Sequence, residues 1–181
     1  MKEPQSPKWT TDLIVTPKPS AANGPKRKQM HHIPIREIMN RSVVTIQPEQ
    51  LVADAAQMME EFKIRRLPVV DQAGYLVGII TDADVLEAEA ANRALNDYEP
   101  GAEEKWLAVG DVMTRAVVTI PVDATIGQLA ATLMEYKVGG LPVVESDPQP
   151  PNRLHMVGIV TETDIFRLIA DAWRAESNLV G

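Results

Sequence analysis

Val77-Gly78-Ile79-Ile80-Thr81-Asp82-Ala83-Asp84 has a second copy in the chain, Val157-Gly158-Ile159-Val160-Thr161-Glu162-Thr163-Asp164. The apolar half of each stretch predicts a buried strand. The Thr-x-x-Asp half is typical of the first turn of a helix, where a Thr caps the helix and an Asp three residues later reaches back to it. A strand that runs directly into a helix N-terminus therefore occurs twice, which indicates two copies of one small unit.

A longer internal repeat supports the duplication. Residues 38–70 are identical to residues 112–144 at 13 of 33 positions, with a constant offset of 74. Beyond residue 145 the offset becomes 80. We therefore place an insertion at residues 146–153, in a predicted hairpin turn, because turns absorb insertions. A tandem duplication is the main conclusion from the sequence.

Each copy predicts the order strand, helix, strand, strand, helix. In the first copy a helical turn at residues 35–39 precedes a strand at 43–46, which is rich in β-branched residues. Pro48 and Glu49 are expected to open the first long helix. Its predicted buried face comprises Val52, Ala55, Ala56, Met59 and Phe62. Strands at 67–70 and 75–80 predict a hairpin, and helices follow from residue 81 to about 96 and, in the second copy, from 161 to about 176.

The first 34 residues differ in composition from the rest of the chain. They contain six prolines, six basic residues and two acidic ones, whereas residues 35–181 contain twelve basic and 23 acidic residues. We predict a disordered, basic, Pro-rich tail at residues 1–34. The predicted first unit is at 35–98, a connector at 99–108, and the second unit with its C-terminal helix at 109–181.

Composition also argues against several classes of protein. The net charge of −7 makes a nucleic-acid partner an unfavoured interpretation. The chain has no Cys, so disulfides, thiolate nucleophiles and Cys-based zinc sites are excluded. The pair His31-His32 lacks a third metal ligand in reach, so no metal site is predicted. No catalytic set and no membrane-length apolar stretch is recognisable, and we expect a cytoplasmic protein that is not an enzyme and has no membrane contact.

The repeated motifs together resemble those of CBS domains, which are named after cystathionine β-synthase. The resemblance rests on Met39-x-x-x-Val43-Val44-Thr45, Leu67-Pro68-Val69-Val70-Asp71 and Val77-Gly78-Ile79-Ile80-Thr81-x-x-Asp84, which recur in the second copy with Glu145 in place of Asp71. It covers residues 35–170. It implies an α/β (α+β) fold in which two βαββα units pack sheet to sheet as one pseudo-two-fold module. It also implies a homodimer whose clefts bind an adenosine-containing ligand such as AMP, ADP or ATP, with S-adenosylmethionine as a further candidate.

The resemblance implies ligand-binding residues at the matching positions. The ribose would be bound by Thr81 and Asp84 in one cleft, here named the Asp84 cleft, and by Thr161 and Asp164 in the other, the Asp164 cleft. Both pairs also have a purely structural interpretation as helix caps that contribute about 1 kcal/mol each. The predicted adenine contacts, which are also plausible core residues, are Thr45, Ile64, Arg66 and Pro68 in the first copy and Thr119, Val138, Gly140 and Pro142 in the second.

The two clefts are not expected to be equal. Arg167 follows Asp164 by three residues, whereas its counterpart after Asp84 is Glu87, which would repel a phosphate. Arg65 and Arg66 occur in the first copy only. We therefore expect a charged nucleotide in the Asp164 cleft, with Arg167 as a ligand and Arg65 or Arg66 reaching over from the facing unit. The Asp84 cleft would be empty or bind a less charged ligand.

Two functional hypotheses follow. The first is a regulatory sensor whose adenosyl ligand changes the geometry of a dimer and thereby its contact with an unidentified regulated protein. The second is a scaffold that binds no ligand and acts through its surface or its basic tail.

Overall fold

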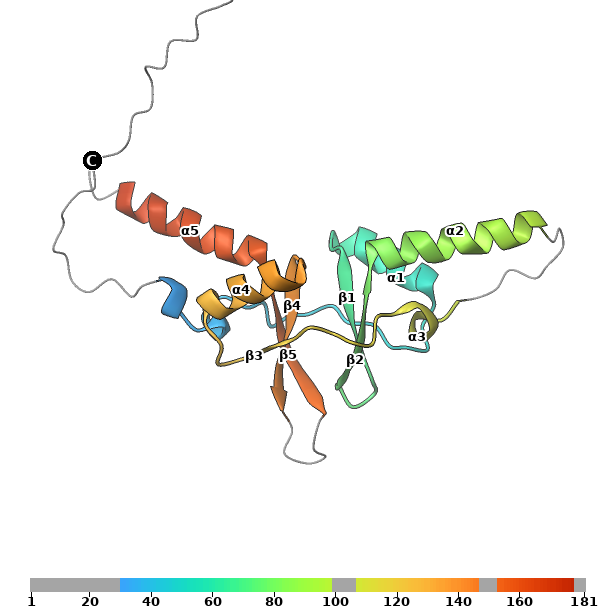
Figure 1. The fold of residues 1–181 in the computed structure, drawn as a ribbon, viewed down its shortest axis with the longest axis horizontal. Helices are drawn as coiled ribbons and strands as arrows, with labels where there is room; N and C mark the ends of the chain where they lie inside the picture. The colour runs from blue at the N-terminus through green and yellow to red at the C-terminus, as the bar shows by residue number, and fades with distance from the viewer. Residues whose placement is uncertain (1–29, 99–106, 147–152, 178–181) are drawn as a thin grey trace, which may run out of the picture.

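The structure is a computed structural model, and it describes residues 30–98, 107–146 and 153–177 (Figure 1). Residues 1–29 of the predicted tail, most of the connector and residues 147–152 of the insertion lie outside the described residues. Residues 30–34, which the sequence assigns to the tail, contain the 3-10 turn η1 (Met30–His32) and a bridge between Pro34 and Thr125. Within the described ranges no helix is long and apolar enough to cross a membrane.

The first unit contains a helix, a β-hairpin and a second helix. α1 is Val52–Phe62, β1 is Arg66–Val70, β2 is Leu76–Thr81 and α2 is Asp82–Tyr98. β1 and β2 are antiparallel, with Arg66 opposite Thr81. The predicted hairpin and the strand-to-helix junction at Thr81 are therefore confirmed.

The second unit repeats this arrangement. α4 is Ile126–Tyr136, β4 is Gly140–Ser146, β5 is Leu154–Thr161 and α5 is Glu162–Ser177. The antiparallel hairpin β4–β5 places Gly140 opposite Thr161, which matches the register of the first unit. Both α1 and α4 end at a lysine in the left-handed conformation, Lys63 and Lys137, each with φ of 54°. The local geometry of the two copies is thus conserved down to the helix termini.

The predicted first strand at residues 43–46 is wrong as a regular strand. Of these residues only Ile46 pairs, in a parallel bridge with Val69. The Ile46 amide donates to the Pro68 carbonyl, and the Val70 amide donates to the Ile46 carbonyl. The segment before it leads away to the other unit, where Asn40 pairs with Ile159. The corresponding segment of the second copy forms the two-residue strand β3 (Ile120–Pro121), parallel to β4.

The first helix begins later than predicted, and one residue of its predicted buried face is exposed. α1 begins at Val52 rather than at Pro48, and the Leu51 amide donates to the Asp54 carboxylate at 3.1 Å, which satisfies one free amide of the first turn. Val52, Ala55 and Met59 are buried as predicted, but Phe62 is half exposed. Phe62 is the last residue of the helix, where the chain leaves the core.

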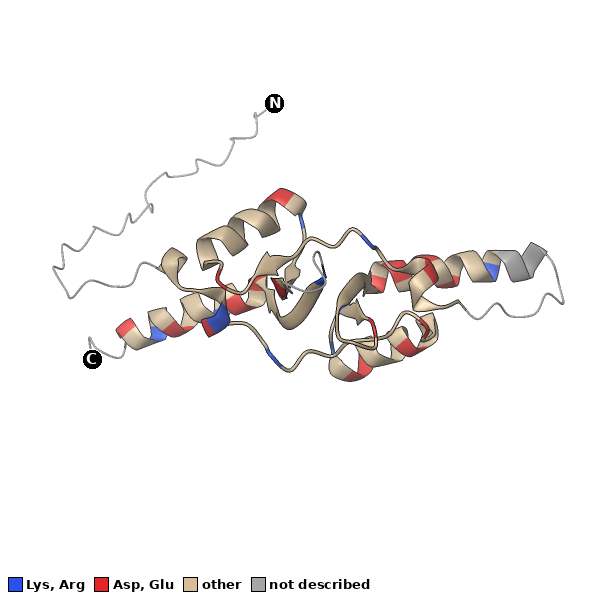
Figure 2. Cartoon of the chain, turned by 90° about the horizontal axis from the view of Figure 1, so that it is seen from below, with Lys and Arg blue, Asp and Glu red and all other residues tan. Residues whose placement is uncertain are grey.

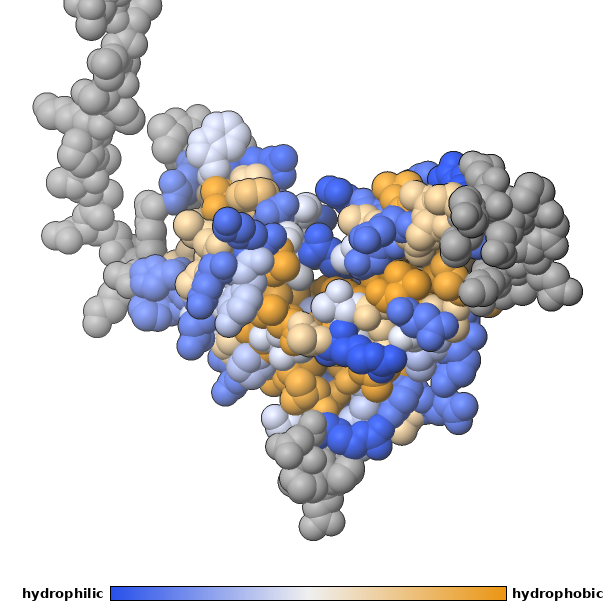
Figure 3. Space-filling model, turned by 45° about the vertical axis from the view of Figure 1, so that its right-hand side comes forward, coloured by the Kyte–Doolittle hydropathy of each residue, from blue (hydrophilic) through white to orange (hydrophobic). Residues whose placement is uncertain are grey.

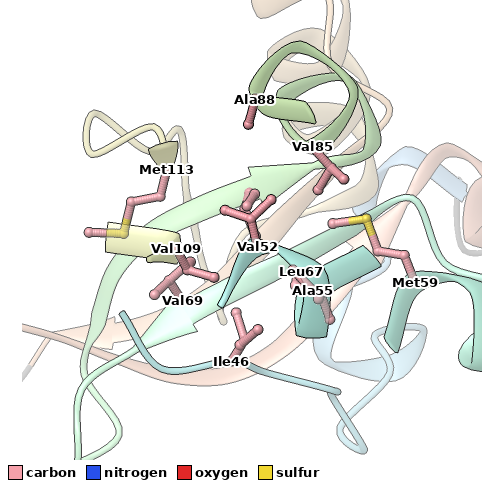
Figure 4. Packing of buried hydrophobic residues seen from close by; sticks show 11 residues of the cluster. Ile46, Val52, Ala55, Met59, Leu67, Val69, Val85, Ala88, Val109 and Met113 are labelled. Carbon is pink, nitrogen blue, oxygen red and sulfur yellow. The ribbon is translucent and has the colours of Figure 1, made fainter. Parts of the chain in front are cut away.

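The lead-in segment of each copy packs under the other copy. Ile35 and Met39, with η2 (Ile35–Glu37), belong to the core of the second unit, and Val109 and Met113, with α3 (Val109–Val112), belong to the core of the first. Figure 4 shows the first of these cores, with Val109 and Met113 beside the residues of α1, β1 and α2. This exchange joins the two units into one module, because neither core is complete without a segment from the other copy.

The glycines of the two repeated stretches allow that exchange. A Cβ atom at Gly78 would lie 2.4 Å from the sulfur of Met113, and one at Gly158 would lie 2.9 Å from the sulfur of Met39. The exchanged segments also pair with these strands, Ile79 with Thr114 and Ile159 with Asn40. Each glycine is required because the methionine of the opposite copy lies directly against the strand.

The tips of the two hairpins are in contact. Tyr75 pairs with His155 in an antiparallel bridge, and the Arg153 guanidinium lies over the Tyr75 ring at 4.0 Å while it also forms an ion pair with Asp71. Arg153 is the last residue of the predicted insertion. In Figure 1 the hairpins β1–β2 and β4–β5 lie side by side at the centre, with α1 and α2 on one side and α4 and α5 on the other.

Candidate functional site

The two Thr-x-x-Asp motifs form helix caps of the same geometry. Asp84 Oδ2 accepts hydrogen bonds from the Thr81 amide at 2.8 Å and from its hydroxyl at 2.7 Å. Asp164 Oδ2 accepts the same two bonds from Thr161, both at 2.8 Å. The capping interpretation is therefore correct for both copies. It uses only one of the two oxygens of each carboxylate, so it leaves a second acceptor at each helix N-terminus.

The second carboxylate oxygen distinguishes the two sites. Asp164 Oδ1 accepts a hydrogen bond from Arg167 at 3.4 Å, whereas Asp84 Oδ1 receives none from the described residues. The side chain of Asp164 is only 14% exposed, while that of Arg167 is 68% exposed. In this conformation Arg167 lies against the outer oxygen of Asp164. Asp84 is the carboxylate that has an acceptor oxygen available.

A cleft of about 1030 Å³ lies between the two units, beside Asp84. Its volume is at the upper end of the range of small-molecule sites. In Figure 3 the surface is hollowed between the helical parts of the two units. The cleft is lined by Arg65, Arg66, Ile79, Thr81, Asp82, Asp84, Thr114, Ala116, Val117, Val118, Ala130, Leu133, Met134, Lys137, Val138, Gly139, Gly140, Leu141, Glu162, Ile165 and Phe166.

Both copies line the cleft, and each contributes polar and apolar residues. The first copy supplies the N-terminus of α2, with Thr81 and Asp84, where free amides and the helix dipole favour an acceptor group or an anion. The second copy supplies most of the apolar lining, from residues 116–118, Val138, Ile165 and Phe166. A flat apolar group with a polar hydroxylated substituent matches this arrangement in size and polarity.

Arg66 lines the cleft and connects the two copies. Its Nη1 donates to the carbonyl of Gly140 at 3.1 Å, and its guanidinium lies close to the Gly139 backbone. Partial burial lowers the pKa of Arg66, and the neighbouring Arg65 lowers it further. A side chain at Gly140 would not fit, because its Cβ would lie 2.8 Å from Thr161 Cγ2 and 2.9 Å from Arg66 Nη1.

Arg65 lies at the rim and is held by Asp82. Its Nε donates to Asp82 Oδ2 at 2.8 Å, and the two side chains are 79% and 41% exposed. This hydrogen bond lowers the pKa of Asp82 and raises that of Arg65. Together with Arg66 and Lys137 the lining has three cations, and Asp82, Asp84 and Glu162 are its three anions. The formal charges of the lining are balanced, so a phosphate would share Arg65 with Asp82, which accepts from Nε alone.

The structure places the predicted site residues in three groups. Arg65, Arg66, Thr81, Asp84, Val138 and Gly140 line the Asp84 cleft. Pro68 in β1 and Pro142 in β4 are fully buried and belong to the protein core. The remaining predicted residues do not line this cleft; they are Thr45, Ile64, Thr119, Thr161, Asp164 and Arg167.

Several lining residues were not predicted. Residues 116–118 precede Thr119, and they line the cleft in its place. Lys137 follows α4 at the position that Lys63 has after α1. This repeat equivalence is the one signal in the sequence that singles out Lys137. Ile165 and Phe166 could not be assigned, because helical spacing does not tell which side of α5 meets the first copy.

The duplicated unit, with the exchanged segments and a cleft lined from both copies, defines a tandem-repeat module with a site for a small molecule. A family model for the CBS domain matches residues 35–91 and 109–171. The chain belongs to the CBS domain family, as its motifs predict, and the family accounts for both repeats.

Curated relatives include longer proteins. The uncharacterized protein MJ1404 of Methanocaldococcus jannaschii is 31% identical over 162 residues, which are 87% of this chain and 37% of that protein. Inosine-5'-monophosphate dehydrogenase of the same organism is 34% identical over 131 residues, which are 72% of this chain and 22% of the enzyme. The chain thus spans only between about a fifth and two fifths of the length of these two relatives.

Two solved structures of CBS domain pairs contain adenosyl ligands. The CBS domain pair of protein MJ0100, in complex with 5'-methylthioadenosine and S-adenosyl-L-methionine, superimposes with a TM-score of 0.62 at 29% identity, covering 77% of this chain and 97% of that one. CBSX2 in complex with AMP gives a TM-score of 0.63 at 25% identity, with 77% and 98% covered. Both of these related pairs therefore bind adenosine ligands.

Proposed function

We propose that this chain is a regulatory module that binds an adenosine-containing ligand in the Asp84 cleft. The observation that supports this most is the free carboxylate oxygen of Asp84, at a helix N-terminus and within a cleft of about 1030 Å³ that has many apolar lining residues. Asp84 would accept hydrogen bonds from the ribose hydroxyls through Oδ1, while Oδ2 keeps the cap. The adenine would lie against residues 116–118 and Val138.

The ligand class rests on the comparisons and on the charge of the site. AMP, S-adenosylmethionine and 5'-methylthioadenosine share the adenosyl group, and all three are bound by related CBS domain pairs. The cleft is electrically balanced, which favours a ligand of low net charge over a triphosphate. This reverses the ranking that the sequence suggests, because Arg167 is engaged with Asp164 and the cations Arg65 and Arg66 line the Asp84 cleft.

The proposed role is regulation rather than catalysis. Ligand binding would alter the contact between the two copies, since the cleft is lined from both, and a dimer would transmit that change to a regulated protein. The equivalent residues Thr161, Asp164 and Arg167 would form a second site once Arg167 turns to the ligand. The scaffold hypothesis is favoured by one observation, because the two helix caps explain both Thr/Asp pairs without any ligand.

A thermal-shift panel separates these two functions. A ligand present at a hundred times its dissociation constant stabilises the folded chain by about 2.7 kcal/mol, which is roughly 5–10 °C for a chain of this size. We expect a shift with AMP, S-adenosylmethionine or 5'-methylthioadenosine, a smaller one with 2'-deoxy-AMP, and none with GMP. No shift across the panel would support the scaffold.

A further inference from the structure

The second unit exposes apolar side chains at positions where the first unit has charged ones. Three side chains show this difference; they are Met134 of α4 and Ile169 and Trp173 of α5, which are 80%, 47% and 68% exposed. Their repeat equivalents in the first unit are Glu60, Glu89 and Arg93. Apolar residues at all three positions indicate a contact that the second unit makes and the first unit does not.

Phe166 joins these residues into one surface. It is 63% exposed, and its spacing of three and seven residues from Ile169 and Trp173 places all three on one side of α5. Phe166 and Met134 both line the Asp84 cleft, so the apolar surface continues onto α4. We name Met134, Phe166, Ile169 and Trp173 the second-unit patch.

The charged surface of the first unit argues against an occupant that contacts both units alike. Glu89 and Arg93 of α2 form an exposed ion pair at 3.7 Å, and burial of such a pair would cost free energy. In Figure 2 acidic residues follow α2 along its length, while both signs of charge occur on α5. We therefore expect the occupant of the patch to lie on the second unit alone.

The N-terminal tail joins the body of the chain at the second unit. A Cβ atom at Gly127 of α4 would lie 3.2 Å from the carbonyl oxygen of His31 in η1. The Ile126 amide donates to the Ile33 carbonyl at 2.9 Å, and α4 in turn packs beside α5. Figure 1 shows η1, α4 and α5 on the same side of the module. The segment that precedes η1 thus starts close to the patch.

The tail has one apolar segment. Apart from Met1 and two alanines, the apolar residues of positions 1–29 are Trp9 and the Leu-Ile-Val run at 13–15. The same 29 residues include six basic and two acidic ones, whereas α5 has two basic and four acidic residues. Apolar burial and the opposite charges would both favour contact between this segment and α5.

The length of the tail is sufficient for this contact. Residues 16–29 separate the apolar segment from η1, and fourteen residues span at most about 50 Å when fully extended. α5 has 16 residues and is therefore about 24 Å long. A segment tethered near its site has an effective concentration of about a millimolar, so even a weak apolar contact would be largely formed.

We propose that Trp9 and residues 13–15 bind the second-unit patch of their own chain. The indole and the aliphatic side chains would cover Phe166, Ile169 and Trp173, and the tail lysines would lie over the acidic residues of α5. The tail would thereby compete with any other partner for this surface, so that a partner gains the patch only by displacing the tail. The contact does not depend on an adenosyl ligand.

Cross-linking within one chain tests this contact directly, because the chain has no Cys of its own. Full-length Leu13→Cys/Ile169→Cys is treated with a short bis-maleimide at low micromolar concentration. Leu13→Cys/Glu89→Cys is the matched control, since Glu89 is the repeat equivalent of Ile169. We expect at least tenfold more intrachain link in the first variant, measured by peptide mass spectrometry of the monomer. Equal yields, or no intrachain link in the first variant, would overturn the proposal.

Single-cysteine variants identify the other occupants that this surface could have. We expect few links between chains when Leu13→Cys is mixed with Ile169→Cys, and few when Ile169→Cys is treated alone. Links in the mixture as abundant as the intrachain link would place the tail of a neighbouring chain on the patch. Efficient linking of Ile169→Cys alone would place a second patch there. Either result would contradict binding of the tail to its own chain.

Labelling kinetics provide an independent measurement. The thiol of Ile169→Cys should react with a bulky maleimide at least threefold faster when Trp9→Ser and Leu13→Ser are added, because the tail no longer covers it. Gln5→Ser/Ala21→Ser, a control within the same tail, should leave the rate unchanged, and circular dichroism checks that all variants are folded. A rate that Trp9→Ser/Leu13→Ser does not change, or one that falls as protein concentration rises, would count against the tail as the occupant.

Discussion

Arg66 donates a hydrogen bond to the carbonyl of Gly140 at 3.1 Å, although the two residues are 74 positions apart and are equivalents of each other in the repeat. Two equivalent residues meet only near the axis that relates the copies. The duplicated chain has thus diverged at its own symmetry axis: one copy supplies a guanidinium, and the other supplies the space and the carbonyl that receive it. A Cβ atom at position 140 would also lie 2.8 Å from Thr161 Cγ2 and 3.1 Å from the Val160 carbonyl oxygen, so the glycine leaves room for β5 as well as for Arg66.

Replacement of Arg66 should destabilise the module. Arg66→Ala removes a charged donor from a partly buried carbonyl, and we expect the free energy of unfolding to fall by about 1 kcal/mol. Arg65→Ala is the matched control, since that side chain is 79% exposed and its loss should change the free energy by less than about 0.5 kcal/mol. Urea unfolding of both variants measures the difference. Equal values for the two would show that the Arg66–Gly140 bond does not join the copies.

The exchanged segments predict a second effect on stability. In Gly78→Ala the new methyl group would lie 2.4 Å from Met113 Sδ, so we expect a loss of about 1–3 kcal/mol from overpacking. The double variant Gly78→Ala/Met113→Ala removes the clash, and its free energy of unfolding should be higher than the sum of the two single effects predicts. Strict additivity would be inconsistent with contact between these residues. Chemical denaturation of the four proteins completes the cycle.

Release of Arg65 should favour charged ligands. Asp82→Asn weakens the hold on the Arg65 guanidinium and removes one of the three anions of the cleft. The affinity for AMP is expected to rise about three- to tenfold, while that for uncharged adenosine stays constant, because only the phosphate gains a cation. Calorimetric titration with both ligands measures the ratio. An equal change for AMP and adenosine would assign the effect to the shape of the site rather than to Arg65.

The Arg65–Asp82 pair predicts that the free energy of unfolding falls slightly as the pH becomes acidic. The hydrogen bond from Arg65 lowers the pKa of Asp82 in the folded chain. The stabilising contribution is therefore present above the pKa of the unfolded chain, about 3.9, and is lost as the pH falls through the lower folded value. Arg65 is 79% and Asp82 41% exposed, so screening by solvent keeps the contribution small. Urea unfolding from pH 6 to about pH 3 should show a slightly shallower loss for Asp82→Asn than for wild type; a steeper loss would contradict the sign.

Much of the fold could be predicted from the repeated stretches. The hairpins and the helices after Thr81 and Thr161 follow from short apolar runs that end in a capping motif, and both caps are present. The exchange of Met39 and Met113 could not be predicted, because periodicity tells which side of an element is apolar but not which copy covers it. The predicted strand at 43–46 failed for a related reason, since the chain just before it, at Asn40, pairs with the other unit and only Ile46 pairs with the first.

The candidate site shows the same limit. Thr81, Asp84, Val138 and Gly140 were all predicted, yet their placement in one cleft depends on how the copies face each other. The preference for the Asp164 cleft rested on Arg167, whose sequence position suggests a phosphate ligand. In the structure Arg167 bonds to Asp164 itself, on the next turn of the same helix. When a cation and a carboxylate are close in the sequence, the sequence does not tell whether the cation would bind a ligand or the carboxylate itself.

The most direct test of the proposed function is a calorimetric titration of AMP into wild type, Asp84→Asn and Asp164→Asn. Asn keeps an oxygen for the Thr81 amide but cannot accept a ribose hydroxyl with its second atom, so the cap persists while the ligand contact is lost. We predict that Asp84→Asn weakens binding at least tenfold, the equivalent of about 1.4 kcal/mol, and that Asp164→Asn retains the tighter site. Unchanged affinity in Asp84→Asn, with binding lost in Asp164→Asn, would contradict the assignment of the ligand to the Asp84 cleft.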